Sequence, residues 1–405
     1  MNASDNAWVL ASSALVLLMT PGLAMFYGGM TRSKNVLSTM MHSFFLMGLA
    51  SVVWLFWAYS LSFGPDAFMG LIGGLQNFAL NGVGAEVRAD TTIPHTTFMI
   101  FQCMFAVITP ALISGAFAER MKFSSFVVFM LLWLTVVYSP ICHWVWGPDG
   151  WLAKLGALDF AGGTVVHINA AAAAMACVVM LGSRKGYGTV AMPPHNLTLT
   201  LLGAGLLWFG WFGFNAGSAL KADAGASMAF VVTHMATAAA AMSWVLAEWV
   251  IKGKPTTLGF ASGAVAGLVA ITPAAGFVGP VSSVILGAVA GVLCYLGVLA
   301  KSALGYDDSL DVIGVHGVGG TWGAIATGLF ASKLINEAGN NGLFFGNAAQ
   351  LWPQVVAVLA TIVYSFVVSL VILLVIKAVM GLRVEEEEEF VGCDTSLHGE
   401  TGYNL

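Results

Sequence analysis

The sequence has few charged residues. Only 9% of its 405 residues are Asp, Glu, Lys or Arg, whereas a soluble protein has about a quarter. Hydrophobic residues make up 58% of the chain, and the mean hydropathy is +0.86. This composition excludes an ordinary soluble protein and predicts an all-α polytopic membrane protein in contact with the lipid bilayer. We expect no nucleic-acid partner.

Cysteine clusters are also missing. The five cysteines are Cys103, Cys142, Cys177, Cys294 and Cys393, and they form no metal or redox spacing. We interpret them as small apolar packing residues and expect no metal, no cofactor and no enzymatic activity. The N-terminus lacks the basic segment of a signal peptide and carries Asp5 instead, so we expect no cleaved leader.

Long apolar runs, by contrast, are abundant. Runs long enough to span a membrane lie at 7–30, 35–63, 94–117, 123–145, 163–182, 197–219, 226–251, 257–275, 278–300, 311–332 and 350–380. They predict eleven transmembrane helices. The runs at 257–275 and 311–332 are rich in glycine and are the least typical spans.

Basic residues predict the orientation of the chain. Those that follow the odd-numbered runs are Arg32 and Lys34, Arg120 and Lys122, Arg184 and Lys185, Lys252 and Lys254, Lys301, and Arg383. Alternating spans place all of them on one side, and an excess of Lys and Arg marks the cytoplasm. The opposite loops contain only Arg88, Lys154, Lys221 and Lys333. We therefore expect a multi-pass plasma-membrane protein with its N-terminus outside and its C-terminus in the cytoplasm.

The eleven predicted spans divide into two halves of five with one left over. An odd number of spans per half inserts the second half upside down, which is the inverted-repeat architecture of many transporters. We expect repeats at about 7–182 and 197–332 and an extra helix at about 350–380. Together they form a transmembrane domain, 1–383, followed by a cytoplasmic tail, 384–405.

Two histidines occupy equivalent places in the two predicted repeats. His167 follows Asp159 by eight residues, and His316 follows Asp308 by eight residues. Inverted symmetry brings the two imidazoles together near the middle of the bilayer, where an ionisable group indicates function. A simple helix–helix hydrogen bond is the alternative. We interpret both aspartates as structural residues that accept N–H groups at a helix start, with direct ion contact as the alternative.

Aromatic residues gather on the outer side of the predicted spans. They are Phe101 and Phe105 on the third span, Trp146 at the end of the fourth, and Trp211 and Phe214, with Ser218, on the sixth. Their spacings place each set on one helical face. Aromatic faces and a hydroxyl can hold a small cation, and phenyl rings beneath them would exclude water. Each residue also has a simpler interpretation when it is taken singly. The phenylalanines are typical of core or lipid-facing positions, and the tryptophan is typical of a membrane interface. The serine is typical of a hydroxyl that bonds the backbone.

A permanent ion cannot cross such a dry constriction cheaply. Ammonium can shed a proton and pass as a small neutral molecule, and two neutral imidazoles would offer it both a donor and an acceptor. The residues therefore favour an ammonium pathway. A membrane redox protein with histidine haem ligands is the alternative that the histidines leave open.

Several motifs resemble the ammonium transporter (Amt/Mep/Rh) family over essentially the whole chain. They include Asp159-Phe-Ala-Gly-Gly-Thr-Val-Val-His167, Gly-Trp211-Phe-Gly-Phe214-Asn-Ala-Gly-Ser218, Gly-Val-His316-Gly-Val-Gly-Gly, Gly-Ala-Phe-Ala-Glu119-Arg120 and Pro21-Gly-Leu-Ala-Met-Phe-Tyr-Gly-Gly-Met. The outer-site serine and tryptophan look more like the microbial and plant Amt branch than the Rh branch.

The resemblance implies a homotrimer with one pore in each subunit and ammonium or ammonia as the substrate. It implies substrate recruitment at Trp146, Phe105 and Ser218, with Phe101 beside them. It further implies a gate formed by Phe101 or Phe105 with Phe214, a pore at His167, His316 and Trp211, and support from Asp159.

The predicted tail is similar to the family's cytoplasmic tail, which responds to PII-type regulatory proteins. It ends in His398-Gly-Glu-Thr-Gly-Tyr403, and its Gly392-Cys393-Asp394 departs from the apolar residue usual at the middle position. An ammonium sensor with little conduction and a Rh-like gas channel are the alternative functions. We interpret His42 and His234 as packing residues, and the sequence explains no role for Pro110.

Overall fold

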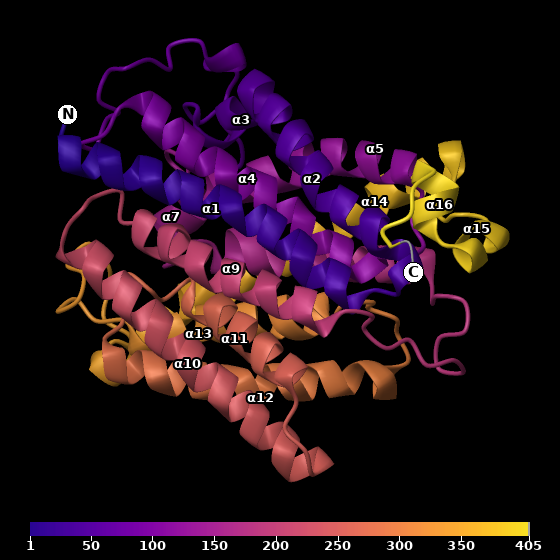
Figure 1. The fold of residues 1–405 in the computed structure, drawn as a ribbon. Coiled ribbons are helices and arrows are strands. Elements are labelled where there is room, and N and C mark those ends of the chain that lie inside the picture. Colours follow the sequence, from indigo (N-terminus) through magenta and orange to yellow (C-terminus); the bar gives the residue numbers. More distant parts are fainter. Residues whose placement is uncertain (404–405) are drawn as a thin grey trace.

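Helices account for every predicted apolar run in the computed structural model, which describes residues 1–403 (Figure 1). The first predicted repeat contains α1 (Ala3–Met30), α2 (Val36–Val53), α3 (Tyr59–Phe63), α4 (His95–Phe117), α5 (Phe123–Trp133), α6 (Ser139–Trp146), α7 (Trp151–Leu155) and α8 (Asn169–Leu181). The second contains α9 (Leu197–Gly217), α10 (Ala224–Lys252), α11 (Thr257–Ile271), α12 (Pro280–Leu304) and α13 (Val318–Phe330). The rest are α14 (Leu351–Met380), α15 (Glu386–Val391) and α16 (Cys393–His398). Residues 404 and 405 of the predicted tail lie outside the described residues.

The predicted all-helical fold class is confirmed, since residues 1–403 form helices and no β-strand. Nine helices of this part of the chain are long and apolar enough to cross a membrane by length and composition. The two glycine-rich runs form shorter helices, α11 and α13. With 15 residues, α11 covers about 23 Å, less than the ~30 Å hydrocarbon core. The count of eleven spans therefore stays a prediction.

The first helices of the two predicted repeats, α1 and α9, pack along each other in opposite directions (Figure 1). Glycines bring their backbones together: a Cβ on Gly203 would lie 2.3 Å from the backbone nitrogen of Phe26, and one on Gly213 would lie 2.6 Å from Leu15. Small residues at helix contacts are typical of membrane proteins. The antiparallel pair is the arrangement expected of inverted repeats.

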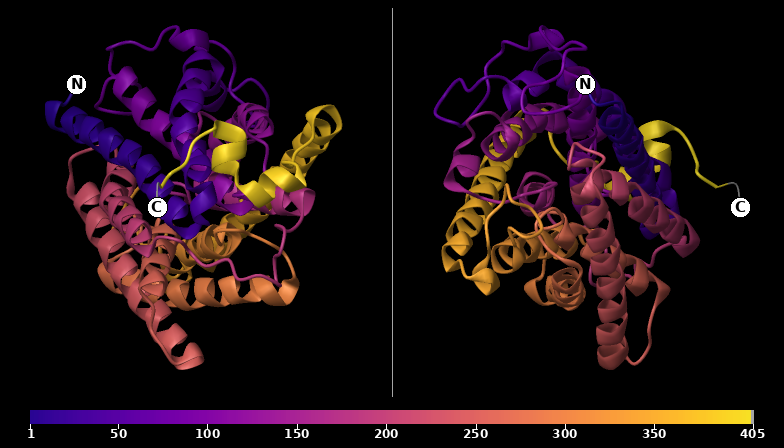
Figure 2. Two further views of the ribbon diagram at one scale, coloured as in Figure 1. Left: turned by 45° about the vertical axis from the view of Figure 1, so that its right-hand side comes forward. Right: turned by 90° about the vertical axis from the view of Figure 1, so that its left-hand side faces the viewer.

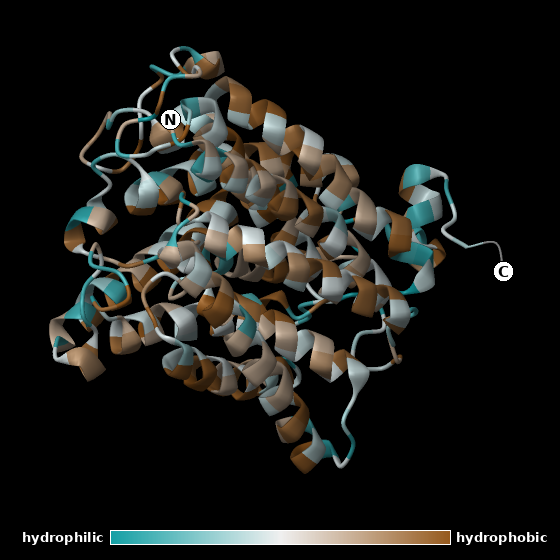
Figure 3. Cartoon of the chain, turned by 60° about the vertical axis from the view of Figure 1, so that its left-hand side comes forward, coloured by the Kyte–Doolittle hydropathy of each residue, from teal (hydrophilic) through white to brown (hydrophobic). Residues whose placement is uncertain are grey.

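The helices end on two opposite sides of the molecule, where its most hydrophilic segments lie (Figure 3). We call one of them the tail side, because it carries residues 384–403 and the connections 31–35, 118–122 and 182–196. The other is the loop side, which carries the long connection 64–94. On the loop side, Asp5 accepts a hydrogen bond from the backbone N–H of Ala222 at 2.8 Å and also bonds Thr92, which ties the start of α1 to both repeats.

The C-terminal segment folds onto the tail side (Figure 2). Asp394 accepts hydrogen bonds from the backbone N–H groups of Leu37 and Ser38 at 3.0 and 2.7 Å, at the start of α2. Glu389 pairs with Arg383 at 2.7 Å. Asp394, which follows the Cys393 that departs from the family's usual tail sequence, thus caps the start of α2, since carboxylates favour helix N-termini.

A buried ion network joins the two predicted repeats on the tail side. The guanidinium of Arg184, after α8, lies 2.8 Å from Asp307 and 3.4 Å from Glu119, and Arg32 lies 2.6 Å from Glu119. Burial alone would raise the pKa of Glu119 and Asp307, but the neighbouring arginines outweigh it and hold both pKa values below their usual range. The stability from these carboxylates is therefore present at neutral pH and lost only as the pH falls below about 4.

We expect Arg184→Met to destabilise the protein by about 3–5 kcal/mol, because removing one partner leaves a charge buried without compensation. The measurement is thermal unfolding of the protein in detergent micelles at neutral pH. Lys185→Met is the matched control, because Lys185 is half-exposed and its pair with Glu386 at 3.0 Å lies at the surface. Equal losses in the two variants would contradict the role of the network.

Candidate functional site

The two histidines meet in the middle of the molecule. Each sits in a π-helical turn that opens a helix: His167 in η5 (Gly163–Ile168), before α8, and His316 in η6 (Ile313–Gly317), before α13. Such turns are rare and concentrate at functional sites. The Nδ1 atoms lie 3.2 Å apart, with ring centroids at 5.2 Å and planes at 23°. Both side chains are buried.

This contact fixes the proton arrangement of the pair when both rings are neutral. One Nδ1 must donate its hydrogen to the other, so one ring is left with a lone pair on Nε2 and the other with an N–H there. The Nε2 of His167 is buried and has no hydrogen-bond partner within residues 1–403. The pair can therefore offer one acceptor and one donor to a small molecule beside it.

Asp159 is placed to hold the turn that carries His167. Its carboxylate accepts hydrogen bonds from the backbone N–H groups of Gly162, Gly163 and Thr164 at 2.8, 2.6 and 2.7 Å, and also bonds the Thr164 hydroxyl. Gly162 has φ of 117°, which a residue with a side chain rarely adopts. The contacts are those of a residue that caps a helix start.

Asp308 occupies the same place before η6 but is much less well bonded. One oxygen accepts a hydrogen bond from the backbone N–H of Ile313 at 2.7 Å, and the other is buried without a partner in the described chain. Burial and the nearby charge of Asp311 raise the pKa of Asp308 to about 6. The position of Thr164 in the first turn is filled by Ile313 in the second, so the second turn lacks the hydroxyl that bonds the aspartate.

The predicted aromatic residues form a continuous row of ring contacts that leads to His167. Centroid distances are 5.1 Å from Phe101 to Phe105, 5.7 Å from Phe105 to Trp146 and 4.3 Å from Phe105 to Phe214. From Phe214 the row continues to Trp211 at 5.4 Å, which stacks on His167 at 5.5 Å with planes at 19°. Phe105 and Phe214, the predicted gate residues, are thus in direct ring contact.

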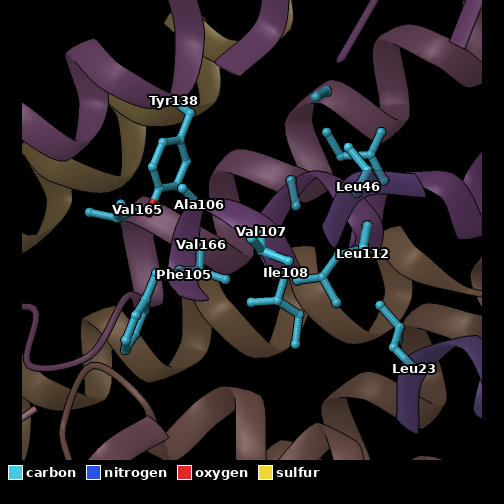
Figure 4. Close-up of a cluster of buried hydrophobic side chains, with 14 of the residues drawn as sticks. Leu23, Leu46, Phe105, Ala106, Val107, Ile108, Leu112, Tyr138, Val165 and Val166 are labelled. Atoms are coloured by element: carbon cyan, nitrogen blue, oxygen red, sulfur yellow. The ribbon is translucent and has the colours of Figure 1, made fainter. Parts of the chain in front are cut away.

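Buried apolar side chains from α1, α4 and η5 pack together in this part of the molecule (Figure 4). Phe105, Ile108 and Leu112 on α4 lie near Val166, the residue that precedes His167 (Figure 4). Between Phe214 and the two histidines is a cavity of about 10 Å³, also lined by Leu23 and Val265. This is roughly the space of one water-sized molecule. A small, mostly apolar cavity therefore lies where the dry constriction is predicted, and the constriction itself stays a prediction.

Two further, separate cavities lie between the histidines and the tail side. The first, of about 20 Å³, shares His316, Phe26 and Val265 with the cavity beside the pair. The second, of about 310 Å³, shares Leu310 and Asp311 with the first and is lined by the connection that follows α8. The route is therefore narrow at the histidines and wide at the tail side.

Ser218 and Trp146 lie at the loop-side end of the row. The Ser218 hydroxyl donates to the Phe214 carbonyl at 2.8 Å, which leaves its oxygen lone pairs free to accept. A Cβ on the preceding Gly217 would lie 2.9 Å from the Phe101 ring. The Trp146 indole donates to the Asp159 carbonyl at 2.9 Å. Asp308 is the one predicted site residue that lies away from this group, towards the tail side.

Two site residues were not found from the sequence. Thr272 accepts a hydrogen bond from the Trp211 indole at 2.9 Å, and Thr164 bonds Asp159. A buried indole N–H needs an acceptor, but the sequence does not say which element supplies it. Pro110 lies within α4, which continues to Phe117. Nothing in its surroundings explains why a proline occupies this position.

The other two intramembrane histidines are separate from the pair. His42 is buried and lies 4.5 Å from Phe126 between ring centroids. His234 is exposed on α10, 5.4 Å from Trp208 between ring centroids.

The haem alternative does not fit the geometry of the pair. The rings contact each other directly, and the cavity beside them holds about 10 Å³, so a porphyrin cannot lie between them.

Comparison with known proteins covers the whole chain. A sequence model of the Ammonium Transporter Family matches residues 7–403. An ammonium transporter of Bacillus subtilis (strain 168) is 53% identical over 405 residues, which are 100% of this chain and 99% of the relative. The crystal structure of Candida albicans Mep2 superposes with a TM-score of 0.91 at 39% identity, covering 96% of this chain and 88% of that chain. A structure described as a sensor Amt protein gives 0.89 at 32% identity, covering 97% and 98%.

These matches extend over both predicted repeats and the tail, and they agree with the resemblance to the microbial Amt branch. Members of the family are transporters and not enzymes. The chain belongs to the ammonium transporter family.

Proposed function

We propose that this protein is an ammonium transporter that recruits ammonium on the loop side, removes its proton and conducts it as ammonia past the histidine pair. The observation that carries the proposal is the cavity of about 10 Å³ against His167 and His316, which is otherwise lined by apolar and aromatic side chains. An ion there would lose its hydration without compensation. A neutral, water-sized molecule could bond the outer nitrogens of the two rings.

Recruitment is assigned to Trp146, Phe105 and Ser218, with Phe101 alongside. The rings of Phe105 and Trp146 meet edge to face at 87°, which leaves ring faces for a cation. The Ser218 hydroxyl already donates to the backbone and can accept an N–H from ammonium. Phe105 and Phe214 form the gate beneath, and Trp211 lines the pore beside His167.

The membrane orientation follows from the basic residues. Arg32, Arg184 and Arg383 all lie on the tail side, where they pair with acidic groups. The positive-inside rule makes this side the cytoplasm. We therefore place the N-terminus outside the cell, the C-terminus in the cytoplasm and the protein in the plasma membrane, so that transport means uptake.

The family resemblance further supports a homotrimer and a cytosolic PII-type regulator that acts at the tail. The tail is suited to this because Cys393 donates its backbone N–H to Asn35 at 2.8 Å, and Glu389 accepts from the backbone of Lys185 at 2.7 Å. The second contact joins the tail to the connection that lines the tail-side cavity.

A sensor is the second candidate, because the structure described as a sensor Amt protein is similar over nearly the whole chain. A sensor would bind ammonium with little conduction. The row of neighbouring cavities between the histidines and the tail side favours conduction instead. A Rh-like gas channel, the remaining alternative, would not depend on an outer cation site.

The experiment that tests the proposal measures ammonium and potassium flux into liposomes containing the purified protein, over a range of pH. We expect ammonium flux and no potassium flux above that of empty liposomes, because potassium has no proton to lose. Binding of ammonium without flux would favour the sensor, and equal fluxes of the two ions would exclude the deprotonation step.

In the same assay we expect His167→Ala and His316→Ala to lose ammonium-over-potassium discrimination by about tenfold or more, about 1.4 kcal/mol, because the shortened side chains let water into the constriction. His234→Ala is the matched control, since His234 lies on an exposed face of α10. Unchanged discrimination in both pore variants would contradict the role of the pair.

Trp146→Leu should raise the ammonium concentration for half-maximal flux by roughly 2- to 30-fold, as expected for the loss of one cation–π contact of about 0.5–2 kcal/mol. The maximal flux should change much less, because the histidine pair is intact. Trp352→Leu is a suitable control, as that tryptophan is largely exposed at the start of α14. The same half-saturation in both variants would point to a gas channel without an outer cation site.

A further inference from the structure

A large apolar cavity lies outside the proposed pathway. It is a groove of about 560 Å³ between α8, α12, α13 and α14. Its walls and floor include Ala171, Ala172, Met175, Leu293, Ile362 and Phe366. Apart from Thr321 and the indole of Trp322, the lining side chains are apolar, and that indole already donates to the Leu286 carbonyl at 2.9 Å. Water would find almost no partners there.

The groove lies at the depth of the bilayer midplane. Ile362 and Phe366 are at the middle of α14, and Leu293 is at the middle of α12. Leu293 and Ile362 are 36% and 37% exposed, so the groove opens sideways from the bundle. At this depth, the medium outside a membrane protein is lipid hydrocarbon.

The surface around the groove is suited to lipid rather than to another copy of the chain. Between positions 359 and 375 the exposed residues of α14 are all aliphatic: Leu359, Ile362, Val363, Val367, Val371, Leu374 and Val375. Helix interfaces in membranes are enriched instead in small and polar residues. The small residues here form the floor of the groove, where they leave room for an occupant.

The floor of the groove is the outer face of the helices that carry the histidines. Ala171 lies one turn after His167, and Gly317 directly follows His316. A Cβ on Gly317 would lie 3.3 Å from that of Ala171, so the two elements are in close contact between the groove and the pair. An occupant of the groove therefore packs against both π-helical turns from behind.

We propose that the groove is a binding site for a hydrocarbon chain of a membrane lipid, which fills the space behind the histidine pair. An empty groove would leave its lining without dispersion contacts. The site does not depend on which molecule crosses the pore.

The test reconstitutes the full chain in bilayers that contain a phosphatidylcholine with a diazirine near the end of one acyl chain. After irradiation, mass spectrometry of the peptides maps the lipid adducts. We expect adducts on Met175, Ile362 and Phe366 at a density several-fold above that on other exposed aliphatic residues of the same helices, because a bound chain stays in the groove.

Two variants on α8 sharpen the test. Ala172→Phe should lower the groove adducts by about fivefold or more, because the ring occupies the space. Val179→Phe, at a 59% exposed position outside the groove, should leave them unchanged. Adducts in simple proportion to exposed area, or no adducts on the groove residues, would overturn the proposal, and the wild-type map decides this even if a variant fails to fold.

Discussion

The cost of placing a bare charge in hydrocarbon governs the central part of this structure. Where the two predicted repeats meet, the only ionisable side chains against the narrow cavity are two imidazoles that bond each other. An imidazole is neutral at pH 7 with little change from its ordinary pKa and still hydrogen-bonds, whereas a carboxyl group or an amine needs a pKa roughly three units from its ordinary value to be neutral there. Every group around them is apolar, aromatic or already bonded, as Trp211 is to Thr272. The site thus offers hydrogen-bonding groups that carry no charge.

Charged side chains lie where they can form ion pairs, and these ion pairs join the two predicted repeats. On the tail side Arg184 joins Asp307 of one predicted repeat to Glu119 of the other, and Arg383 joins the tail through Glu389. Along the bundle, by contrast, α1 and α9 meet through glycines such as Gly203 and Gly213. In the low dielectric of the membrane an unpaired charge is costly. Helices therefore contact each other through close backbone packing within the bundle, and charged side chains form ion pairs at its ends.

The sequence was most informative where a pattern recurs. The equal Asp-to-His spacings predicted the meeting of His167 and His316, and composition predicted the fold class. It was least informative about contacts between elements. Nothing in the sequence selects Phe105 as the ring that contacts both Trp146 and Phe214. Likewise Thr272 comes to Trp211 only through the packing of α9 against α11. The glycine-rich runs that looked least like spans became the short helices, because close packing in the interior does not need membrane-spanning length.

The two predicted repeats give the pair its symmetry, but their chemistry differs, and that difference gives the route a direction. The turn before His167 is held by an aspartate with at least four donors, beside the aromatic row. The turn before His316 is held by Asp308, which has one bonded oxygen and one bare one, and beyond it the cavities widen to the tail side. Within residues 1–403 the aromatic row lies towards the loop side, and the proposed function uses it as the entrance for the cation. In the proposed mechanism ammonium loses its proton before the constriction, so selection belongs to the loop side. The wide cavity on the tail side, lined by Lys301 and Asp311, is then where the neutral molecule would regain water and a proton.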